Sequence, residues 1–399
     1  MKLIYLVYRE DNVMVYESQV LEYLRAMKEK QLFDSIELVV FRHEQNLNKK
    51  IEVEARIHQY IDKAASFWSF PVLCMLQLTI NALRLHNYIR KNYSKEEQIS
   101  VVCRGDLAAY IGIRAFRDFP NSRILYDNRG LAYEESVMSH SRNYVHMLNR
   151  NAKRKALNQS KLHCDMYNFV TNAMRDYLVK EYAFSASVPY TIIPTLYHAE
   201  EGTNEEYDII AKREKIKLDD YVISYIGSTA AWQSTQKLVD IIRMIGEKYL
   251  TARFFILSNG EIPELNTLSE QINTRVVMKT VPHKEMKYYL RMTHIGIVIR
   301  NKSIVNHVAA PTKIAEYLTN GVTILYSGDI GIISDLKGKT DGSQIVCIET
   351  DSDWLERIDP SRFPQKRIDP ATVDYFDMDK RQYETYNMMK NAFKKTKIK

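Results

Sequence analysis

The chain has 399 residues, of which 45% are hydrophobic and 26% are charged. This length exceeds what one hydrophobic core usually serves, so we expect two domains of roughly 150 to 200 residues, and the composition excludes a disordered or fibrous chain. The formal net charge of +7 suits a polyanionic partner, for which a nucleoside diphosphate, an anionic membrane surface and a nucleic acid are the candidates.

The basic residues are concentrated in two runs, 142–161 and 390–399. Runs of this kind are usually solvated faces. We expect no nucleic acid among the partners, because aromatic residues are not interleaved with the basic ones in a stacking pattern.

The four cysteines lie far apart, in no metal-ligand or redox spacing, which favours a reducing cytoplasm. The start, MKLIYLVYRED, has a short apolar run that ends at Arg9 and Glu10, so it predicts a strand and not a secretory signal. Because no His/Cys cluster has the spacing of a metal site, we expect no metal and no cofactor. The expected location is the cytoplasm, with the inner face of the membrane as an alternative.

The first half predicts a doubly wound α/β domain. Residues Lys2 to Tyr8 and Ile36 to Phe41 read as strands, with an amphipathic helix from Glu17 to Lys30 between them. Charged residues follow the first strand where glycines would cradle a phosphate, so we do not expect this half to bind a nucleotide. We assign it instead to a second substrate, the acceptor of a transferred group.

Two helices are expected next, from Ile51 to Ser66 and from Val72 to Tyr93. The segment from Phe67 to Leu83, which starts after the first of these helices and ends inside the second, is very apolar. We interpret it as core, because it is too short and too often interrupted by polar residues to span a membrane. The alternative is that Phe67, Trp68 and Phe70 contact a membrane or a lipid-linked acceptor.

Charged residues follow the predicted strands Ile99 to Cys103 and Arg123 to Tyr126. Such positions belong to the crevice where α/β sheets bind ligands. Two interpretations stay open, an acceptor or catalytic site and an ion pair that only holds a loop. The candidates are Arg104, Asp106, Asp127, Arg129, Glu134 and Glu135.

A domain boundary is predicted near residue 196, after a strand that ends at Pro194-Thr195. The next strand, Tyr221 to Ile226, stops at Gly227-Ser228-Thr229, where the glycine permits close backbone approach and the hydroxyls offer donors for phosphate. We therefore predict domains at 1–196 and 197–368, followed by a helix and basic tail at 369–399.

The most informative stretch, 296–331, alternates strand, loop, helix, strand and loop. Its helix is expected to begin at Pro311 and to stop at Asn320-Gly321. Lys313 and Glu316 are three residues apart and share a face, so they form either a phosphate and ribose site at a helix N-terminus or an exposed ion pair.

The string Pro311-Thr312-Lys313-Ile314-Ala315-Glu316-Tyr317-Leu318, with Gly321 and the later Ile330-Gly331, resembles the donor signature of family 4 glycosyltransferases with the GT-B fold. Glu316 matches the second glutamate of that family's E-x7-E motif. The first glutamate is replaced by Val308. The segment Asp127-Asn128-Arg129-Gly130 also resembles a D-x-R-G segment of some bacterial polysaccharide glycosyltransferases.

The resemblance implies two Rossmann-like domains facing a cleft, with a terminal helix, Asp369 to Lys395, that crosses back to the first domain. It implies that Glu316 holds the ribose and that Val281 or a neighbour flanks the base. Many members of the family bind the diphosphate with arginine and lysine near the turn that matches 227–229, but the stretch 228–237 has no arginine, so we assign this role to Lys313 and Arg300. The expected site is then catalytic Lys313, Arg300, Arg129 and Asp127, donor-binding Gly227, Ser228, Thr229, Val281, Lys313, Glu316 and Gly331, and acceptor-binding Arg104 and Glu134.

We therefore predict a glycosyltransferase that uses a nucleotide sugar and a glycan or lipid-linked acceptor in the synthesis of a surface polysaccharide or glycan. The resemblance implies retention of the anomeric configuration and no metal requirement. An inverting enzyme would instead need a base among Asp106, Asp127, Glu134 and Glu135. A sugar-nucleotide epimerase of the same architecture and a non-catalytic binding protein remain alternatives.

Overall fold

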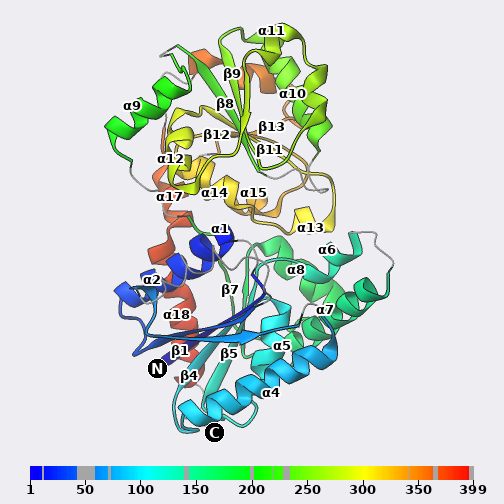
Figure 1. Cartoon of the computed structure of the whole chain (residues 1–399), viewed down its shortest axis with the longest axis vertical. Helices are drawn as coiled ribbons and strands as arrows, with labels where there is room; N and C mark the ends of the chain where they lie inside the picture. Colours follow the sequence, from blue (N-terminus) through cyan, green and yellow to red (C-terminus); the bar gives the residue numbers. More distant parts are fainter. Residues whose placement is uncertain are drawn as a thin grey trace. The chain divides into compact units, whose positions relative to one another are not determined.

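The computed structural model describes residues 1–10, 13–42, 59–70, 73–138, 143–197, 202–217, 219–227, 234–340, 342–362 and 367–394. The chain forms two compact units, Met1–Pro194 together with Met378–Lys399, and Thr195–Asp377 (Figure 1). The first boundary lies two residues before the predicted one. The second lies nine residues after it, so the segment 369–377 belongs to the second unit.

The first unit is built on a seven-stranded parallel sheet with the order β3-β2-β1-β4-β5-β6-β7. The order reverses between β1 and β4, and in such sheets ligands bind outside the carboxyl ends of the strands at this point. The strands are β1 (Lys2–Tyr8), β2 (Ile36–Arg42), β3 (Lys63–Trp68), β4 (Ile99–Arg104), β5 (Ser122–Asn128), β6 (Met166–Phe169) and β7 (Tyr190–Ile192).

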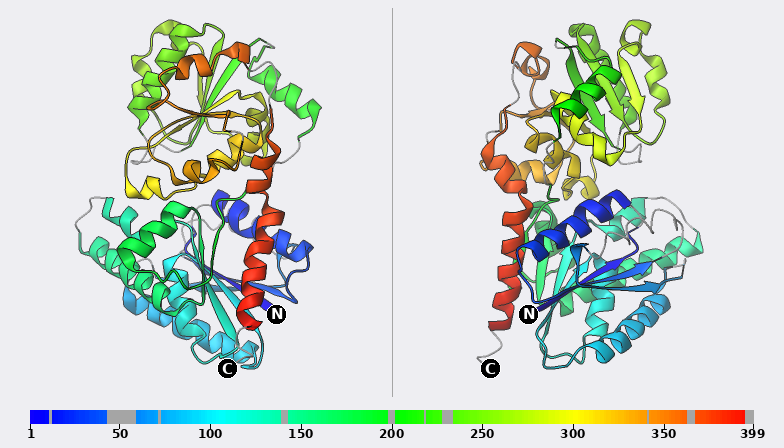
Figure 2. Two further views of the ribbon diagram at one scale, coloured as in Figure 1. Left: turned by 180° about the vertical axis from the view of Figure 1, so that it is seen from behind. Right: turned by 60° about the vertical axis from the view of Figure 1, so that its left-hand side comes forward.

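Helices cover both faces of this sheet (Figure 2). One face carries α1 (Val13–Tyr16), which continues through a π-helical turn, η1 (Glu17–Leu21), into α2 (Glu22–Glu29), and the terminal helix α18 (Met378–Lys394). The other face carries α4 (Met75–Asn92), α5 (Asp106–Ala115) and α7 (Tyr144–His163), while α6 (Ala132–Met138) and α8 (Asn172–Tyr182) complete the unit.

The second unit has a six-stranded parallel sheet with the order β10-β9-β8-β11-β12-β13. Its switch point lies between β8 and β11. The strands are β8 (Tyr221–Ile226), β9 (Ala252–Leu257), β10 (Val276–Lys279), β11 (Ile295–Ile299), β12 (Thr323–Ser327) and β13 (Ile345–Cys347).

The helices of the second unit follow its strands along the chain. They are α9 (Asn204–Arg213), α10 (Thr235–Lys248), η2 (Pro263–Thr267), α11 (Glu270–Asn273), α12 (His283–Met292), α13 (Ile304–His307), α14 (Thr312–Thr319), α15 (Gly331–Leu336), α16 (Trp354–Arg357), η3 (Pro360–Arg362) and α17 (Pro370–Phe376). Of the helices in the described ranges, none is long and apolar enough to cross a bilayer.

The inner strands of both sheets form from short apolar runs because they are buried on their two faces, whereas the edge strand β3 is largely exposed. The central strand β11 is buried at all five positions. Gly296 in β11 admits the ring of Tyr317, since an added Cβ would lie 2.5 Å from that ring. The prediction of α/β doubly wound architecture is confirmed.

Three local predictions were wrong. Lys63–Trp68 is not helical but pairs with β2 as the edge strand β3, while 51–58 of the proposed helix lies outside the described residues. The segment 67–83 is not wholly core, because Trp68, Phe70 and Leu76 are exposed. The terminal helix is broken at Asp377, whose extended backbone separates α17 from α18.

The helix α18 packs against the first unit, as predicted for a helix that crosses back. Gln382 Nε2 donates a hydrogen bond to the Tyr23 carbonyl at 3.0 Å, and Met389 is fully buried in the core that β1 and α2 share. In contrast, Tyr375 and Phe376 of α17 pack in a core of the second unit.

Candidate functional site

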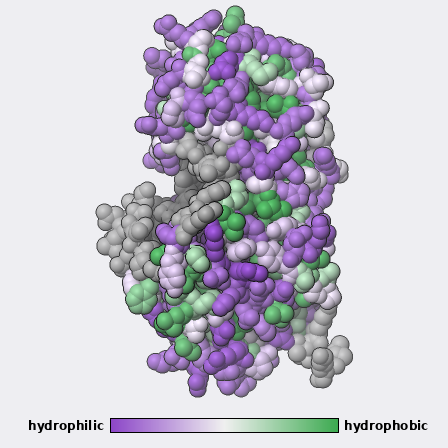
Figure 3. All heavy atoms as spheres, turned by 90° about the vertical axis from the view of Figure 1, so that its right-hand side faces the viewer, coloured by the Kyte–Doolittle hydropathy of each residue, from purple (hydrophilic) through white to green (hydrophobic). Residues whose placement is uncertain are grey.

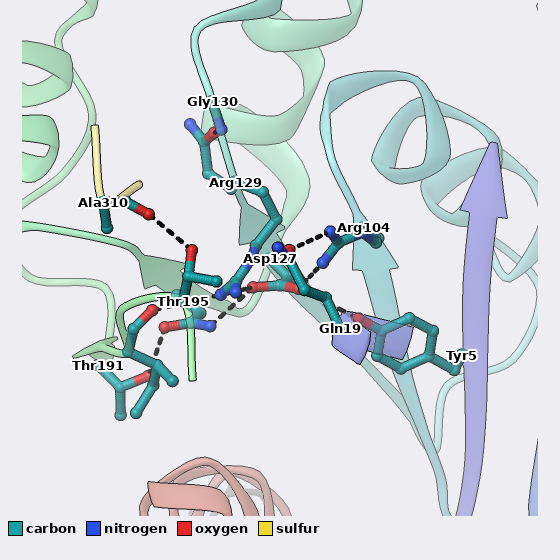
Figure 4. Close-up of polar contacts among 12 residues, drawn as sticks. Tyr5, Gln19, Arg104, Asp127, Arg129, Gly130, Thr191, Thr195 and Ala310 are labelled. Atoms are coloured by element: carbon teal, nitrogen blue, oxygen red, sulfur yellow. Dashed lines mark hydrogen bonds and ion pairs between the residues drawn. The ribbon is translucent and has the colours of Figure 1, made fainter. Parts of the chain in front are cut away.

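The candidate donor site is built around the start of α14. Pro311 is the N-cap and the helix begins at Thr312, one residue later than predicted, because Pro311 has an extended backbone. Thr195 Oγ1 donates a hydrogen bond to the Ala310 carbonyl at 2.8 Å, which fixes the chain just before the helix (Figure 4). Gly321, with φ of +69°, ends the helix as predicted.

Lys313 lies in the first turn of α14 and is 8% exposed. Its Nζ is 4.7 Å from the centre of the Tyr225 ring at the end of β8. Burial, and then the nearby Arg300 charge, lower the pKa of Lys313 to about 7, against the opposing effect of Glu316. A partly desolvated amine at a helix N-terminus is well placed to receive an anion.

Glu316 lies one turn after Lys313 and is half-buried. Burial raises the pKa of this carboxyl to about 7, and Lys313 acts against the shift. The exposed ion pair considered from the sequence is therefore excluded for these two residues, since a surface pair would be hydrated. Both groups lie where a ligand would change their protonation.

Arg300 follows β11 directly, so it lies at the same sheet edge as Lys313. Its Nη1 donates a hydrogen bond to Asn306 Oδ1 at 2.8 Å, and Asn306 Nδ2 donates to the Asn301 carbonyl at 2.7 Å. Asn306 is fully buried and holds the guanidinium in place. The sequence did not point to Asn306 or Tyr225, because neither contact follows from spacing along the chain.

The loop after β12 adds two features that the sequence analysis missed. His307 Nδ1 lies 2.6 Å from Asp329 Oδ2, in an exposed pair. Glu349, which follows β13, accepts a hydrogen bond from Gly328 N–H at 3.2 Å and pairs with Lys237 Nζ at 2.6 Å. The Lys237 ammonium lowers the pKa of Glu349. Gly331 is the first residue of α15 and is buried.

The remaining donor candidates are placed as follows. Gly227 directly follows β8, and its N–H donates a hydrogen bond to the Leu257 carbonyl at 3.1 Å. Ser228 and Thr229 lie outside the described residues. The side chain of Val281 is buried in a core with Tyr289, so only its backbone could face a base. Lys313, Arg300, Glu316 and Gly227 thus share one edge of the second sheet.

In the first unit, the structure brings Arg104, Asp127 and Arg129 into one buried cluster (Figure 4). Asp127 Oδ2 lies 4.0 Å from Arg104 Nη1, and Asp127 Oδ1 lies 3.5 Å from Arg129 Nη1. Tyr5 Oη and Asn168 Nδ2 donate to the same carboxylate at 3.3 and 2.7 Å.

The two arginines also have other partners. Arg104 Nη2 donates to Gln19 Oε1 at 2.8 Å, and Arg129 Nη1 donates to the Ile193 carbonyl at 3.2 Å. This arrangement holds the loop after β5 to the end of β7. It favours a structural role for Asp127, because its oxygens are already occupied.

Glu134 does not join this cluster. It lies with Asp106 on the α5 side of the sheet, since Asp106 contacts Tyr126, whose side chain points away from that of Asp127. Tyr177 and Tyr182 both donate to Glu134 Oε1, at 3.2 and 2.5 Å. Burial is the main cause that raises the pKa of Asp106 to about 7, the hydrogen bond with Tyr126 acts against it, and the Glu134 and Glu135 charges add to it.

Within the described ranges, no group of three or more His, Cys, Asp or Glu side chains could hold a metal ion. The groups gathered at the carboxyl edges of the two sheets are cations, carboxylates and helix N–H groups.

No protein-family model matches the chain. No curated protein sequence matches it. Solved structures do match over the whole length. HepE of Anabaena in complex with UDP superposes with a TM-score of 0.65 at 11% identity, covering 100% of both chains.

The lipopolysaccharide outer core galactosyltransferase WaaB gives a TM-score of 0.65 at 10% identity, with 98% of this chain and 100% of that chain covered. A glycosyltransferase from Rickettsia africae ESF-5 gives 0.62 at 12% identity, with 98% and 94% covered. The chain has the GT-B fold. Lys313 and Glu316 lie on α14 of this fold. This helix follows β11, one of the two strands between which the order of the second sheet reverses.

Proposed function

We propose that the protein is a glycosyltransferase that moves a sugar from a nucleoside diphosphate sugar to a hydroxyl group. The observation that carries the proposal is the buried Lys313 amine in the first turn of α14, which a bound anion would keep protonated, with Arg300 beside it and Glu316 one turn later. Two cations and helix N–H groups offer an anion site, and a carboxylate one turn away offers an acceptor for ribose hydroxyls.

The mechanism that this chain supports is stabilisation of the leaving group. As the glycosidic bond to the diphosphate breaks, negative charge grows on the phosphate oxygen, and Lys313 and Arg300 would neutralise it. Because the two groups are already fixed by Tyr225 and Asn306, little reorganisation is needed in the transition state. The departing phosphate can itself receive the proton of the attacking hydroxyl.

We also propose that the enzyme retains the anomeric configuration of the donor sugar, because among the residues that the structure describes no free general base stands at the candidate acceptor site. An inverting enzyme needs a free general base, and Asp127 is enclosed by two guanidinium groups, a tyrosine hydroxyl and an amide. Asp106 is the better inverting candidate by its raised pKa, but it is buried and bonded to Tyr126. Product stereochemistry determined by NMR distinguishes the two outcomes.

The surface polysaccharide or glycan role, the lipid-linked or glycan acceptor and the absence of a metal requirement are part of the same proposal. The solved GT-B structures of HepE with UDP and with UDP-glucose suggest UDP as the first probe for this chain. Activity in the presence of a chelator tests the metal requirement.

The first experiment is titration of UDP into the wild-type protein, Lys313→Ala and the matched control Lys337→Ala, whose side chain is exposed on the same unit. Loss of a charge-assisted contact of about 1.5 to 3 kcal/mol should weaken binding by Lys313→Ala roughly 10- to 100-fold, with the control unchanged. Equal affinity of Lys313→Ala and wild type for every nucleoside diphosphate that binds would exclude the proposed site.

Incubation with nucleotide sugars, with and without acceptors, then separates the activities. Transfer only in the presence of an acceptor supports the transferase. A change of the donor sugar alone would identify an epimerase, and binding without turnover would identify a binding protein.

A further inference from the structure

The helices on one face of the first sheet carry an unusual share of the positive charge. α4 contains three cations, α7 contains five, and neither has an aspartate or glutamate, while Asp106 and Arg114 cancel in α5. With Glu134 and Glu135 of α6, which lie on the same side of the sheet, these helices carry a net charge of +6 out of the +7 of the whole chain. The rest of the molecule is therefore close to neutral, and this layer is where an anionic partner would be attracted.

The same layer exposes apolar side chains. Leu76, Ile80 and Leu83 recur at helical spacing along the outer side of α4 and are 70%, 38% and 49% exposed. Trp68 and Phe70, at the end of β3, are 42% and 55% exposed, and their rings lie 4.4 Å apart.

Arg84 links these two apolar groups. Its Nη1 donates a hydrogen bond to the Trp68 carbonyl at 2.6 Å, and its guanidinium lies 5.4 Å from the centre of the Phe67 ring. The stripe on α4 and the aromatic pair on β3 therefore form one surface, with a cation between them.

The start of α7 adds a third apolar group, at the same edge of the sheet. Tyr144, Val145 and Met147 are 72%, 42% and 53% exposed. Both α4 and α7 lead into parallel strands, so both helices begin near the carboxyl ends of the strands. Figure 3 views the chain from the side on which both helices begin in Figure 1, and green hydrophobic residues lie there among purple hydrophilic ones.

We propose that this α4–α7 face, defined by Trp68, Phe70, Leu76, Ile80, Leu83, Tyr144, Val145 and Met147 with the cations of α4 and α7, binds the surface of an anionic bilayer. Apolar side chains that enter the headgroup region and cations that meet anionic lipids are the two components of interfacial binding. This binding needs no spanning helix.

Charge and chemistry favour a bilayer over other occupants. A second copy of the chain would bring the same positive layers together, which costs electrostatic energy. A nucleic acid would match the charge but gives Leu, Ile, Val and Met side chains nothing to stack on. The bilayer matches both the cations and the aliphatic groups.

One consequence rests on the proposed function. The α4–α7 face begins at the carboxyl edge of the first sheet, the edge where Arg104 and Arg129 lie. A hydroxyl acceptor anchored in the bilayer would then be presented at the edge assigned to the acceptor. The lipid binding itself does not require transferase activity, so the two proposals can fail separately.

The test is flotation of the full chain with vesicles of phosphatidylcholine alone and of phosphatidylcholine mixed with phosphatidylglycerol. We expect binding to the mixed vesicles and release at high salt, because screening weakens the attraction. Arg154→Gln with Lys155→Gln, both exposed on α7, should lower the partition coefficient roughly thirty-fold, and Leu76→Ser with Ile80→Ser and Leu83→Ser roughly a hundredfold.

Matched controls come from the second unit. Lys217→Gln with Lys284→Gln removes two exposed charges there, and Ile209→Ser with Leu250→Ser removes two exposed apolar side chains. Both controls should bind like wild type. Unchanged melting temperatures and UDP affinities in all variants keep a folding defect from being counted as support.

Three results would overturn the proposal. One is the absence of binding to the mixed vesicles, and another is equal binding by the α4 and α7 variants and the controls. The third is a dimer in light scattering that the α4 variant abolishes while no vesicle binding occurs, which would assign the face to self-association.

Discussion

At the scale of single residues, a substitution of Asp127 distinguishes a catalytic role from a structural one. Its carboxylate lies between Arg104 and Arg129, whose side chains are 8% and 16% exposed. Removing the negative charge leaves two guanidinium groups buried without it, and breaking a buried ion pair in this way typically costs about 3 to 5 kcal/mol. We therefore predict that Asp127→Asn lowers the melting temperature of the first unit markedly.

Thermal unfolding monitored by circular dichroism checks this prediction, with Asp118→Asn as the control, because Asp118 is exposed in the same unit. A catalytic base would behave differently. In that case Asp127→Asn would lose transfer activity at an unchanged melting temperature, and the structural assignment would be wrong.

Lys313 gives a prediction about pH. Its pKa of about 7 means that the amine is largely neutral in the free protein above pH 7, while a bound diphosphate would restore the charge. Binding then takes up a proton, so UDP affinity should fall as pH rises from about 7.5 to 9, by up to about tenfold per pH unit.

Glu316, whose pKa is also about 7, completes its ionisation at the lower end of this range, and Arg300 stays protonated, so above about pH 8 Lys313 is the group of the site whose titration changes the affinity. Lys313→Arg keeps its charge and should show a flat profile. Calorimetric titration of UDP measures both profiles, and a flat wild-type profile would contradict the pKa shift.

At the scale of elements, the position of α14 depends on Tyr317. Its hydroxyl donates to the Ser224 carbonyl and accepts from Ile226 N–H, both at 3.0 Å, and its ring lies against Gly296. Gly296→Ala would place a methyl group 2.5 Å from the ring, so we predict a loss of about 1 to 3 kcal/mol of stability and weaker UDP binding.

Tyr317→Phe separates the two effects, because it keeps the ring and removes only the hydroxyl. It should cost about 1 to 3 kcal/mol by leaving the Ile226 N–H without its partner, with a smaller change in UDP affinity than Gly296→Ala. Tyr383→Phe, at an exposed position, is the control for both. Wild-type UDP affinity in Gly296→Ala would show that this contact does not position the site.

Elements that were predicted correctly have signals within the element itself. The apolar runs of β1, β8 and β11 and the glycine stop of α14 are local, so spacing along the chain was sufficient. The strand β3 contains Ala64, Ala65 and Ser66, which have no strand preference, and it forms because the edge of β2 offers backbone partners. The break at Asp377 lies between residues that pack in two different units. The periodicity of apolar residues along the helix gives no sign of this change of packing partner.

The placement of the candidate site residues was likewise predictable only where they are close together along the chain. Lys313 and Glu316 are neighbours on one helix turn, and Arg300 follows its strand directly. By contrast, the contacts that enclose Asp127 join residues as far apart as Tyr5 and Asn168, so sequence spacing did not decide between a base and a buried ion pair. Glu349 and Lys237 are 112 residues apart and were missed for the same reason.

At the scale of the whole molecule, the two units have separate cores. One core joins β1 and β2 with α2 and α18, and others lie wholly within 195–377. Chains of this kind often unfold in more than one step. Because Lys313, Arg300 and Glu316 all belong to the second unit, a nucleotide should stabilise that unit directly.

We therefore predict two transitions in differential scanning calorimetry, of which UDP shifts one. At a UDP concentration of about 100 times Kd the stabilisation is about 2.7 kcal/mol, which corresponds to roughly 5 to 10 °C for a unit of this size. Asp127→Asn should lower the other transition and leave the UDP shift intact, while Lys313→Ala should abolish the shift. A single transition that moves as a whole with either UDP or Asp127→Asn would mean that the units unfold together, since a unit with an independent core responds only to changes in its own contacts.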